Sequence, residues 1–294
     1  MASSEPVPTI EAVAPGIEAV VIPSSRSAWL SEGGLPVRAY VLEGAAQPPD
    51  SRPPVLLIDA GYAERLSVEA ISTALAGRPL RAILLTHLHP DHAGGALALA
   101  ARHGAAIRAN PEALRSHAAA AELRERIEPI VPGETLRCGG LQLRAIASPG
   151  HAPGHLAFHD PERGLLWSGD AILGAGTVLV GPPDGSLGDY LETLDRLEAL
   201  EPLERILPGH GPPVEQPRKR IAAIRRHRHM RLDQIRRLLA ERPHEPDEIV
   251  AALYAGQIPD ALLPLARGSV LGSLLYLEQQ GEAVRHGDRW QAVT

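Results

Sequence analysis

The segment THLHPDH, residues 86–92, carries three histidines and an aspartate within six positions. In an extended chain His87 and His89 point to one side, while Asp91 and His92 turn toward a neighbouring position. Imidazole and carboxylate groups together suit zinc, iron or manganese ions. An exposed histidine-rich turn is the plain alternative. Four potential ligands directly after an apolar run favour a metal site over such a turn.

Three further segments place a potential ligand beside glycine, just after an apolar run. They are Pro149-Gly150-His151, Ser168-Gly169-Asp170 and Pro208-Gly209-His210-Gly211. Glycine lets the backbone approach a metal closely and adopt positive φ. A turn histidine or turn aspartate explains each segment alone, but with the first motif they supply seven ligands in an order that fits two metals. Two ions about 3.5–4 Å apart would turn a bridging water into hydroxide at neutral pH, for attack on a carbonyl or a phosphorus.

The ordered motifs THLHPDH, SPGH, SGD and LPGHG resemble those of the metallo-β-lactamase-fold hydrolase superfamily, over residues from about 15 to 217. The resemblance implies an α/β fold, a four-layer αββα sandwich with two metals at one edge. It also implies the ligands: His87, His89 and His151 for one ion, Asp91, His92 and His210 for the second, and Asp170 as a bridge. Two divalent ions are therefore expected, with Zn²⁺ preferred and Mn²⁺ or Fe²⁺ as alternatives.

Asp91 and His155 are candidate catalytic residues. Asp91 could orient the hydroxide or shuttle its proton. His155 lies four residues after His151, and contact with a ligand or the substrate explains it as well as a capping or packing role does. By the resemblance, Asp59 at the end of the apolar run VLLI is expected to bond a ligand histidine and fix its tautomer. Cys138 lies away from every ligand motif and is expected to be a plain thiol.

Short apolar runs that read as buried strands come before the ligand motifs. Strands are expected at 17–22, 37–42, 55–58, 81–85, 141–147, 156–159, 164–167 and 205–207. Helices are expected at 67–76, 94–103, 111–128 and 189–200. Strands and helices thus alternate, with antiparallel pairs mixed in. This pattern favours an α/β layered domain with mixed sheets over an all-α or all-β fold.

The pattern changes near residue 217. Helix periodicity over 218–242 is followed by expected helices at 247–254 and 265–280, and by two short strands around Gly287-Asp288. Two helices and a two-stranded wing make a winged-helix-like plan. We therefore expect a metallo-β-lactamase-fold hydrolase domain over 1–217 and a basic helix with a winged-helix-like domain over 218–294.

The stretch AILGAGTVLVGPPDGSLGDYLETLDRL, with LPGHG and this tail, is similar to the beta-lactamase-like protein 2 family. Some members of that family cut single-stranded RNA. The same arrangement is similar to acyl-carrier-protein thioesterases of polyketide pathways. The two groups share the metal site and the fold, so the ligands do not separate them. Homodimers, which are common in the family, are also expected by the resemblance.

Composition excludes several other classes of protein. The 294 residues are 44% hydrophobic and 22% charged, as in ordinary globular proteins. A net charge of −6 excludes a globally basic nucleic-acid binder. The single cysteine excludes an internal disulfide. No apolar run approaches the roughly 20 residues that span a bilayer, and the first residues do not resemble a secretory signal, so we expect a cytoplasmic protein with no membrane partner.

Three functions stay open at this point. The first is an endoribonuclease on single-stranded RNA, because nine cationic residues lie between Arg218 and Arg237, although a solvated helix in an arginine-rich chain explains them equally. No aromatic residue interleaves with them, so base stacking is not supported. The second is a hydrolase of acyl thioesters, small esters or lactones. The third, a metal-binding regulator, is disfavoured because a structural site usually closes its coordination.

Overall fold

The first sheet of the protein has seven strands. The structure is a computed structural model that describes residues 7–23, 36–46, 48, 51–116 and 121–293. In spatial order the strands are β1 (Thr9–Ala14), β2 (Ile17–Ile22), β3 (Val37–Glu43), β4 (Val55–Ile58), β5 (Leu80–Leu84), β6 (Ala106–Ala109) and β7 (Ile127–Pro129). The pairs from β1 to β4 are antiparallel, and those from β4 to β7 are parallel. The sheet is therefore mixed, as the sequence predicts.

The second sheet has five strands in the order β12-β11-β10-β9-β8. They are β8 (Thr135–Cys138), β9 (Leu141–Ala147), β10 (Leu156–Asp160), β11 (Leu165–Gly169) and β12 (Arg205–Pro208). Only β11 and β12 pair in parallel; the other neighbours are antiparallel. The Tyr40 hydroxyl on β3 donates to the carbonyl of Pro208 at 2.8 Å, which ties the two sheets together beside the end of β12.

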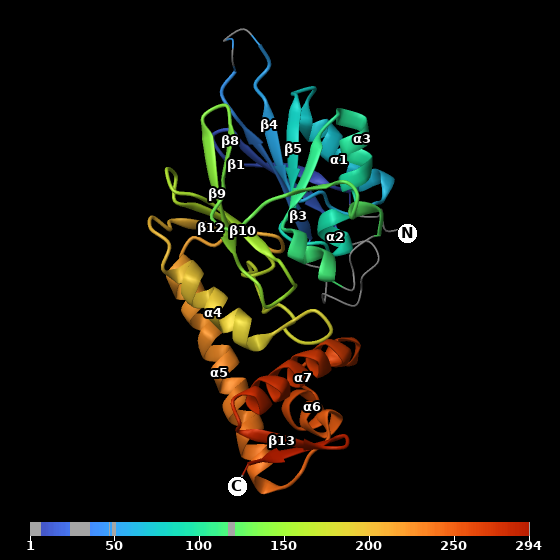
Figure 1. Cartoon of the computed structure of the whole chain (residues 1–294), viewed down its shortest axis with the longest axis vertical. Helices are drawn as coiled ribbons and strands as arrows, with labels where there is room; N and C mark the ends of the chain where they lie inside the picture. The colour runs from blue at the N-terminus through green and yellow to red at the C-terminus, as the bar shows by residue number, and fades with distance from the viewer. Residues whose placement is uncertain (1–6, 24–35, 47, 49–50, 117–120, 294) are drawn as a thin grey trace, which may run out of the picture.

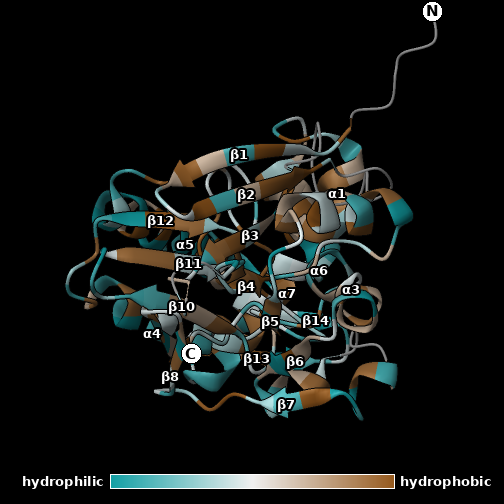
Figure 2. Cartoon of the chain, turned by 90° about the horizontal axis from the view of Figure 1, so that it is seen from above, coloured by the Kyte–Doolittle hydropathy of each residue, from teal (hydrophilic) through white to brown (hydrophobic). Residues whose placement is uncertain are grey.

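Both sheets are covered by helices on their outer faces. Helices α1 (Arg65–Leu75) and α3 (Ala96–His103) cover the first sheet, and α4 (Leu187–Glu198) covers the second (Figure 2). Strand β4 shows how the layers form, because Val55 and Leu57 pack toward the helices whereas Leu56 and Ile58 pack toward the other sheet. A strand buried on both faces reads as a continuous apolar run. The four-layer αββα sandwich is confirmed.

Helix α5 (Pro217–Glu241) runs from the sandwich into the tail (Figure 1). The tail contains α6 (Pro246–Tyr254), the short 3₁₀ turn η3 (Asp260–Leu262), α7 (Leu263–Gln279) and the hairpin of β13 (Ala283–His286) with β14 (Arg289–Ala292). The winged-helix-like plan is thereby confirmed. None of the helices in the described ranges is long and apolar enough to cross a membrane.

One apolar core joins the tail to the sandwich. It contains Leu194 of α4, Ile206 of β12, Ile221 of α5, Leu274 of α7 and Trp290 of β14. Each of these side chains is at most 1% exposed. The tail is therefore packed against the outer layer of the second sheet as part of the same buried core.

The prediction of a helix over 111–128 is wrong. The described residues form two short 3₁₀ turns, η1 (Pro111–Arg115) and η2 (Ala121–Leu123), followed by β7, and residues 117–120 lie outside the described ranges. Only Ala113 and Leu123 bury apolar side chains in these turns. Pairing of β7 with β6 outweighs the local helix propensity, which is a weak predictor beside tertiary contacts.

Candidate metal centre

The predicted ligands come together at one edge of the sandwich. They follow strand ends: His87 and His89 after β5, His151 after β9, Asp170 after β11 and His210 after β12, while the short helix α2 (Pro90–Ala93) carries Asp91 and His92. Strands that end at the same edge place the following loops side by side. The seven residues thus meet although they span more than a hundred positions of the chain.

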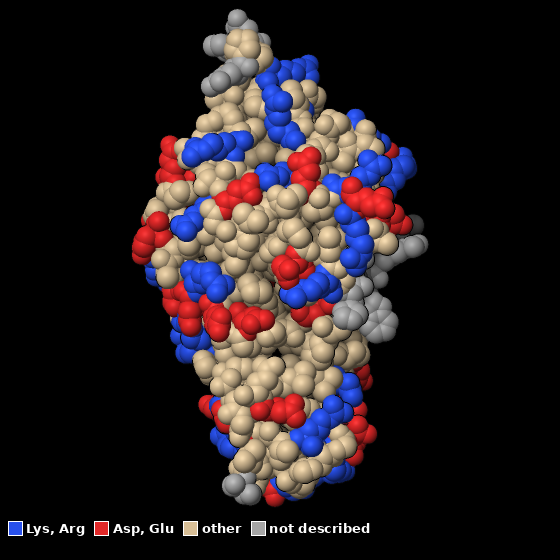
Figure 3. All heavy atoms as spheres, viewed as in Figure 1, with Lys and Arg blue, Asp and Glu red and all other residues tan. Residues whose placement is uncertain are grey.

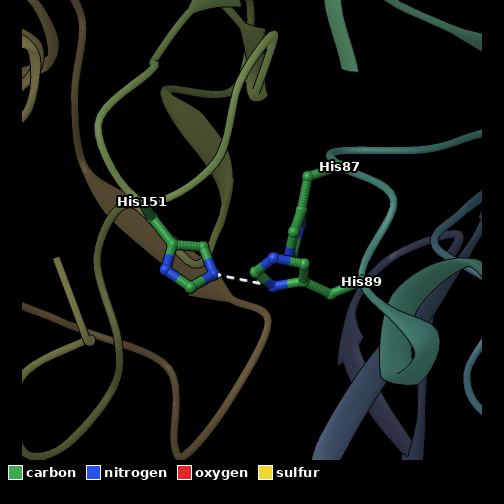
Figure 4. Close-up of side chains that lie close together, drawn as sticks. All are labelled: His87, His89 and His151. Carbon is green, nitrogen blue, oxygen red and sulfur yellow. Dashed lines mark hydrogen bonds between the residues drawn. The ribbon is translucent and has the colours of Figure 1, made fainter. Parts of the chain in front are cut away.

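The first group contains His87, His89 and His151. Their ligand nitrogens all lie within 4.8 Å of one another. Figure 4 shows the three rings pointing toward a common centre, His87 and His89 from one loop and His151 from the opposite one. Nε2 of His151 and Nδ1 of His89 are 3.0 Å apart.

The second group contains Asp91, His92 and His210. Nε2 of His210 lies 3.1 Å from Oδ2 of Asp91 and 3.2 Å from Nε2 of His92. Asp170 lies between the two groups, since its Oδ1 is 3.4 Å from Nε2 of His92 and its Oδ2 is 3.7 Å from Nε2 of His151. This is the arrangement in which one carboxylate can serve two ions.

The chemistry of these groups fits two divalent ions. Nε2 of His87 is buried and has no hydrogen-bond partner among the described residues. Buried polar atoms in native proteins are almost always bonded, so an orphan of this kind needs an explanation. An ion among the imidazole nitrogens and carboxylate oxygens would satisfy it with the ligand types that zinc-like metals prefer.

Three of the histidines are held by their Nδ1–H groups, which donate to fixed acceptors. His87 donates to Oγ1 of Thr86 at 3.0 Å, and His151 donates to the carbonyl of Leu179 at 2.9 Å. His92 donates to Oδ2 of Asp59 at 2.7 Å. Each ring therefore presents Nε2 to the centre, as a metal-binding histidine with a bonded outer nitrogen does.

Asp59 makes the contact predicted for it. Besides the bond from His92, its Oδ1 accepts the backbone N–H of Thr86 at 2.8 Å, and its carboxylate accepts the Thr86 hydroxyl. Asp59 is 2% exposed and has φ of +60°, a backbone conformation that residues other than glycine rarely adopt. Such strain persists only where the surroundings impose it, and here it holds the carboxylate behind the histidines.

The side chains of the centre have strongly shifted pKa values. Burial, with help from the neighbouring imidazoles, lowers the pKa of His87 well below its usual value. Burial also lowers the pKa of His151, to about 4. Burial raises the pKa of Asp91, but His92 and His210 outweigh it and hold the value at about 2. For His87, His151 and Asp91 these are the protonation states that metal binding requires. Burial lowers the pKa of His92 and His210 too, but Asp170 and Asp91 outweigh it and raise both values, so these two rings would release a proton when an ion binds.

His155 lies behind the centre. It is fully buried; its Nδ1–H donates to Oγ of Ser148 at 2.8 Å, and its Nε2 accepts the backbone N–H of Asp170 at 3.1 Å. Both ring nitrogens are therefore occupied. This burial does not fit contact with the substrate, so the catalytic role expected for His155 is not supported. Its bond from the Asp170 N–H is the expected contact with a ligand residue.

Gly209 has no side chain, and this leaves room beside its backbone for the His92 ring and the Asp170 carboxylate. A Cβ at this position would lie 2.6 Å from Cε1 of His92 and 2.7 Å from Oδ1 of Asp170. Real side chains do not approach so closely. The glycine of the LPGHG motif is thus required by the close approach of the backbone to the centre.

The centre opens into a cavity of about 430 Å³. His89, Asp91, His151, Asp170 and His210 form its floor. The walls come from the loop after β11, from α5, and from α6 and α7 of the tail, and they are mostly apolar. A second hollow of about 330 Å³ shares His89, His151 and Leu179 and extends over residues 181–184.

Sequence reasoning missed Asp184. Its Oδ2 lies 3.4 Å from Nε2 of His89, the one histidine of the first group that offers Nδ1 to the centre. Asp184 lies within the stretch that carries the family resemblance, but no ligand motif marks it. Its loop carries no periodic pattern, and only the folded chain brings it to His89. Cys138, by contrast, is buried on β8 and away from the centre, as expected.

Comparison with known proteins decides the family. The family model for the metallo-beta-lactamase superfamily matches residues 33–210, more than half of the chain. The chain belongs to the metallo-beta-lactamase superfamily. The model for the beta-lactamase associated winged helix domain matches residues 246–290.

Relatives extend this assignment. The chain is 30% identical over 208 residues to the beta-lactamase-like protein 2 homolog of Drosophila melanogaster, covering 68% of this chain and 69% of the relative. It is 38% identical to the hydroxyacylglutathione hydrolase of Rhodobacter capsulatus over 133 residues, 45% of this chain and 48% of that protein, so it matches only about half the length of this relative. The crystal structure of a metallo-beta-lactamase family protein from Thermus thermophilus superposes with a TM-score of 0.77 at 27% identity, over 96% of this chain and all of that one. The protein is a hydrolase of this metal-dependent superfamily.

Helix α5 is the predicted basic helix, and most of its arginine side chains bond to other groups of the protein. Arg218 pairs with Glu201, Arg225 with Asp195 and Glu198, and Arg236 with Asp233 and Glu282. Arg220 and Arg228 donate to backbone carbonyls. On the face shown in Figure 3, cationic and acidic residues are interspersed. Most of these arginines thus have partners within the protein.

Proposed function

We propose that this hydrolase cleaves thioesters or esters of small acyl compounds. The observation that carries the proposal is the cavity of about 430 Å³ whose floor is the metal centre and whose walls are mostly apolar. Cavities of roughly 300–1,000 Å³ with apolar walls and a few polar groups are typical of sites for small molecules. An acyl chain would fill the apolar part while its carbonyl lies on the centre.

The relatives support this choice. The hydroxyacylglutathione hydrolase of Rhodobacter capsulatus is named for the hydrolysis of a thioester, and its match covers 45% of this chain. The paired arginines of α5 leave fewer cations for a phosphate backbone than the sequence suggests. RNA cleavage stays a prediction, and the experiment below tests it directly.

The chain's own residues would divide the work. When bound, divalent ions at the two groups would polarise the carbonyl and activate water for attack. Asp91 reaches the cavity floor as an ionised carboxylate and can orient that water by accepting a hydrogen bond from it. Asp59, Thr86 and the carbonyl of Leu179 keep three histidines in fixed orientations. The second hollow offers the leaving thiol or alcohol a place beside His89 and His151.

A paired assay on zinc- or manganese-loaded protein tests the proposal. One arm offers N-acetylcysteamine thioesters of acids with two to eight carbons, and the other offers fluorescent single-stranded RNA. We expect thioester hydrolysis that Asp170→Ala abolishes. RNA cleavage that depends on Asp170, without turnover of any thioester or ester, would reject the proposal and assign a nuclease.

A further inference from the structure

Two arginines of α5 line the cavity that contains the metal centre. They are Arg228 and Arg231, three positions apart and therefore neighbours on one face of the helix. No sequence motif and no family match assigns them a ligand. Their contacts differ from those of Arg218, Arg225 and Arg236 of the same helix, which pair with carboxylates.

Arg228 is buried, with 7% of its surface exposed. One of its amino groups donates to the carbonyl of Val178, and its guanidinium lies 5.2 Å from the centre of the Tyr190 ring. Its Nε–H is buried without a hydrogen-bond partner among the described residues. The side chain is thus fixed in place while one donor stays unsatisfied.

Arg231 is held in a similar way. Its guanidinium lies 4.4 Å from the centre of the Tyr254 ring, and one amino group donates to Oε1 of Gln234 at 3.0 Å. Its Nε is also buried without a partner in the described part of the chain. Stacking on an aromatic face fixes the plane of a guanidinium and leaves its edge free to bind a carboxylate or a phosphate.

Neither Arg228 nor Arg231 forms an ion pair with a carboxylate in the described ranges, whereas Arg225 and Arg236 of the same helix pair with acids at 2.6 Å. Burial of an unpaired cation is costly unless an anion compensates it. Burial, followed by the charges of Arg228 and Arg231, lowers the pKa of the neighbouring His227, which also lines the cavity. Among the described residues, no carboxylate thus pairs directly with the positive charge at this wall.

We propose that Arg228 and Arg231 bind an anionic group of the substrate, a carboxylate or a phosphate. The substrate class is then an acyl ester or thioester whose reacting carbonyl and anionic group are separated by an apolar segment. Val178, Leu179, Leu265 and Ala266 of the cavity wall would contact that segment. The identity of the reacting group as an ester or thioester rests on the proposed function, whereas anion binding by the two arginines does not depend on it.

Binding of product-like acids tests the anion site without hydrolysis. Calorimetry on zinc-loaded protein would compare hexanoate with adipate and with 6-phosphonohexanoate, and then dicarboxylates of four to ten carbons. A second charged end that reaches the arginines should strengthen binding by roughly tenfold, the size of a charge-assisted hydrogen bond. The tighter of the two six-carbon diacids identifies the anion as carboxylate or phosphate.

Three variants make the test specific. Arg231→Gln should remove the advantage of the diacid, and Arg231→Lys should restore only part of it. Arg226→Gln, an exposed arginine of the same helix outside the cavity, should keep it in full. Since Arg228 also supports the loop through Val178, Arg228→Gln is interpreted only if its melting curve stays cooperative. Equal binding of hexanoate and every diacid, or a diacid advantage that survives Arg231→Gln, would overturn the proposal.

Hydrolysis of neutral and charged thioesters then shows on which side of the cleaved bond the anionic group of the substrate lies. The hexanoyl N-acetylcysteamine thioester is the neutral reference. The adipoyl N-acetylcysteamine thioester places the charge on the acyl side, and S-hexanoyl 6-mercaptohexanoate places it on the thiol side. We expect kcat/KM to rise about tenfold for one charged substrate over the neutral one, with the rise lost in Arg231→Gln. Turnover of all three at equal rates overturns the anion site alone. Absence of turnover, with diacid binding intact, rejects the proposed function alone.

Discussion

Asp170 contacts histidines of both groups, with Oδ1 at 3.4 Å from His92 and Oδ2 at 3.7 Å from His151. Its removal should therefore damage both ion positions at once. We expect Asp170→Ala, and likewise His87→Ala, to abolish hydrolysis while the circular dichroism spectrum stays that of the folded protein. The measurement is kcat/KM together with bound metal by elemental analysis.

A matched control for Asp170→Ala is Asp288→Ala, since the Asp288 side chain is 91% exposed and lies in the distant wing. This variant should keep full activity and full metal content. Near wild-type turnover in the double variant of His87 and Asp170 would refute the assignment of the centre.

Asp59 offers a second prediction for a single side chain. Its carboxylate accepts bonds from His92 and from Thr86, so Asp59→Asn removes an acceptor that both need. Loss of such an outer partner typically costs about 10- to 100-fold in metal affinity or activity. Competition with a chromophoric chelator would measure the zinc affinity.

Asp160 serves as the control for Asp59→Asn. It is equally buried, at 2% exposed, but its carboxylate caps the turn after β10 through the N–H groups of Glu162 and Arg163. Asp160→Asn should lower the free energy of unfolding without changing zinc affinity. A similar loss of affinity in both variants would mean that Asp59 acts only through general stability.

At the scale of elements, the loop after β11 lies directly on helix α7. A Cβ at Gly272 of α7 would lie 2.3 Å from the carbonyl oxygen of Val180. Gly272→Ala should force the helix away from the loop and cost about 1–3 kcal/mol of stability, as overpacking does. Because Leu179 and Ala266 of these two elements line the cavity, KM should change as well.

Gly188 of α4 provides the comparison for Gly272. Its Cβ would lie 3.6 Å from the Tyr276 ring, an ordinary contact, so Gly188→Ala should stabilise the helix by about 0.5–1 kcal/mol. Urea unfolding measures both changes. Stability of Gly272→Ala at or above the wild-type value would show that the two elements do not need their close approach.

Periodicity in the sequence predicted most of these elements, whereas the ligand motifs and the family resemblance predicted the residues of the centre. Strands β4 and β5 appear as apolar runs because both faces are buried, and the ligands follow strand ends in one order along the chain. Three features of the structure could not be predicted from the sequence in this way. The turns of 111–128 are set by pairing with β6, Asp184 has no motif, and the partners of Arg225 and Arg236 lie 30 and 46 positions away. Contacts between distant segments decide all three.

At the scale of the whole molecule, metal binding should stabilise the fold. Ions that bind the native chain at a concentration of 100 times Kd add about 2.7 kcal/mol to the free energy of unfolding. At about 2–4 °C per kcal/mol, removal of metal should lower Tm by about 5–10 °C. Scanning calorimetry with and without a chelator measures the shift. The Asp170→Ala variant should show a smaller one, and an unchanged Tm in wild-type protein would contradict metal binding at the centre.

The order of segments along the chain has a consequence for synthesis on the ribosome. All seven predicted ligands precede residue 211, whereas α5, α6 and α7, which wall the cavity, begin at Pro217. At roughly 5–20 residues per second, several seconds pass between emergence of β12 and emergence of α7. A nascent chain therefore presents a complete ligand set to the surrounding solution before the enclosing helices exist. Metal insertion can precede closure of the cavity, and the wall that α7 contributes through Leu265, Ala266 and Ser269 is acquired last.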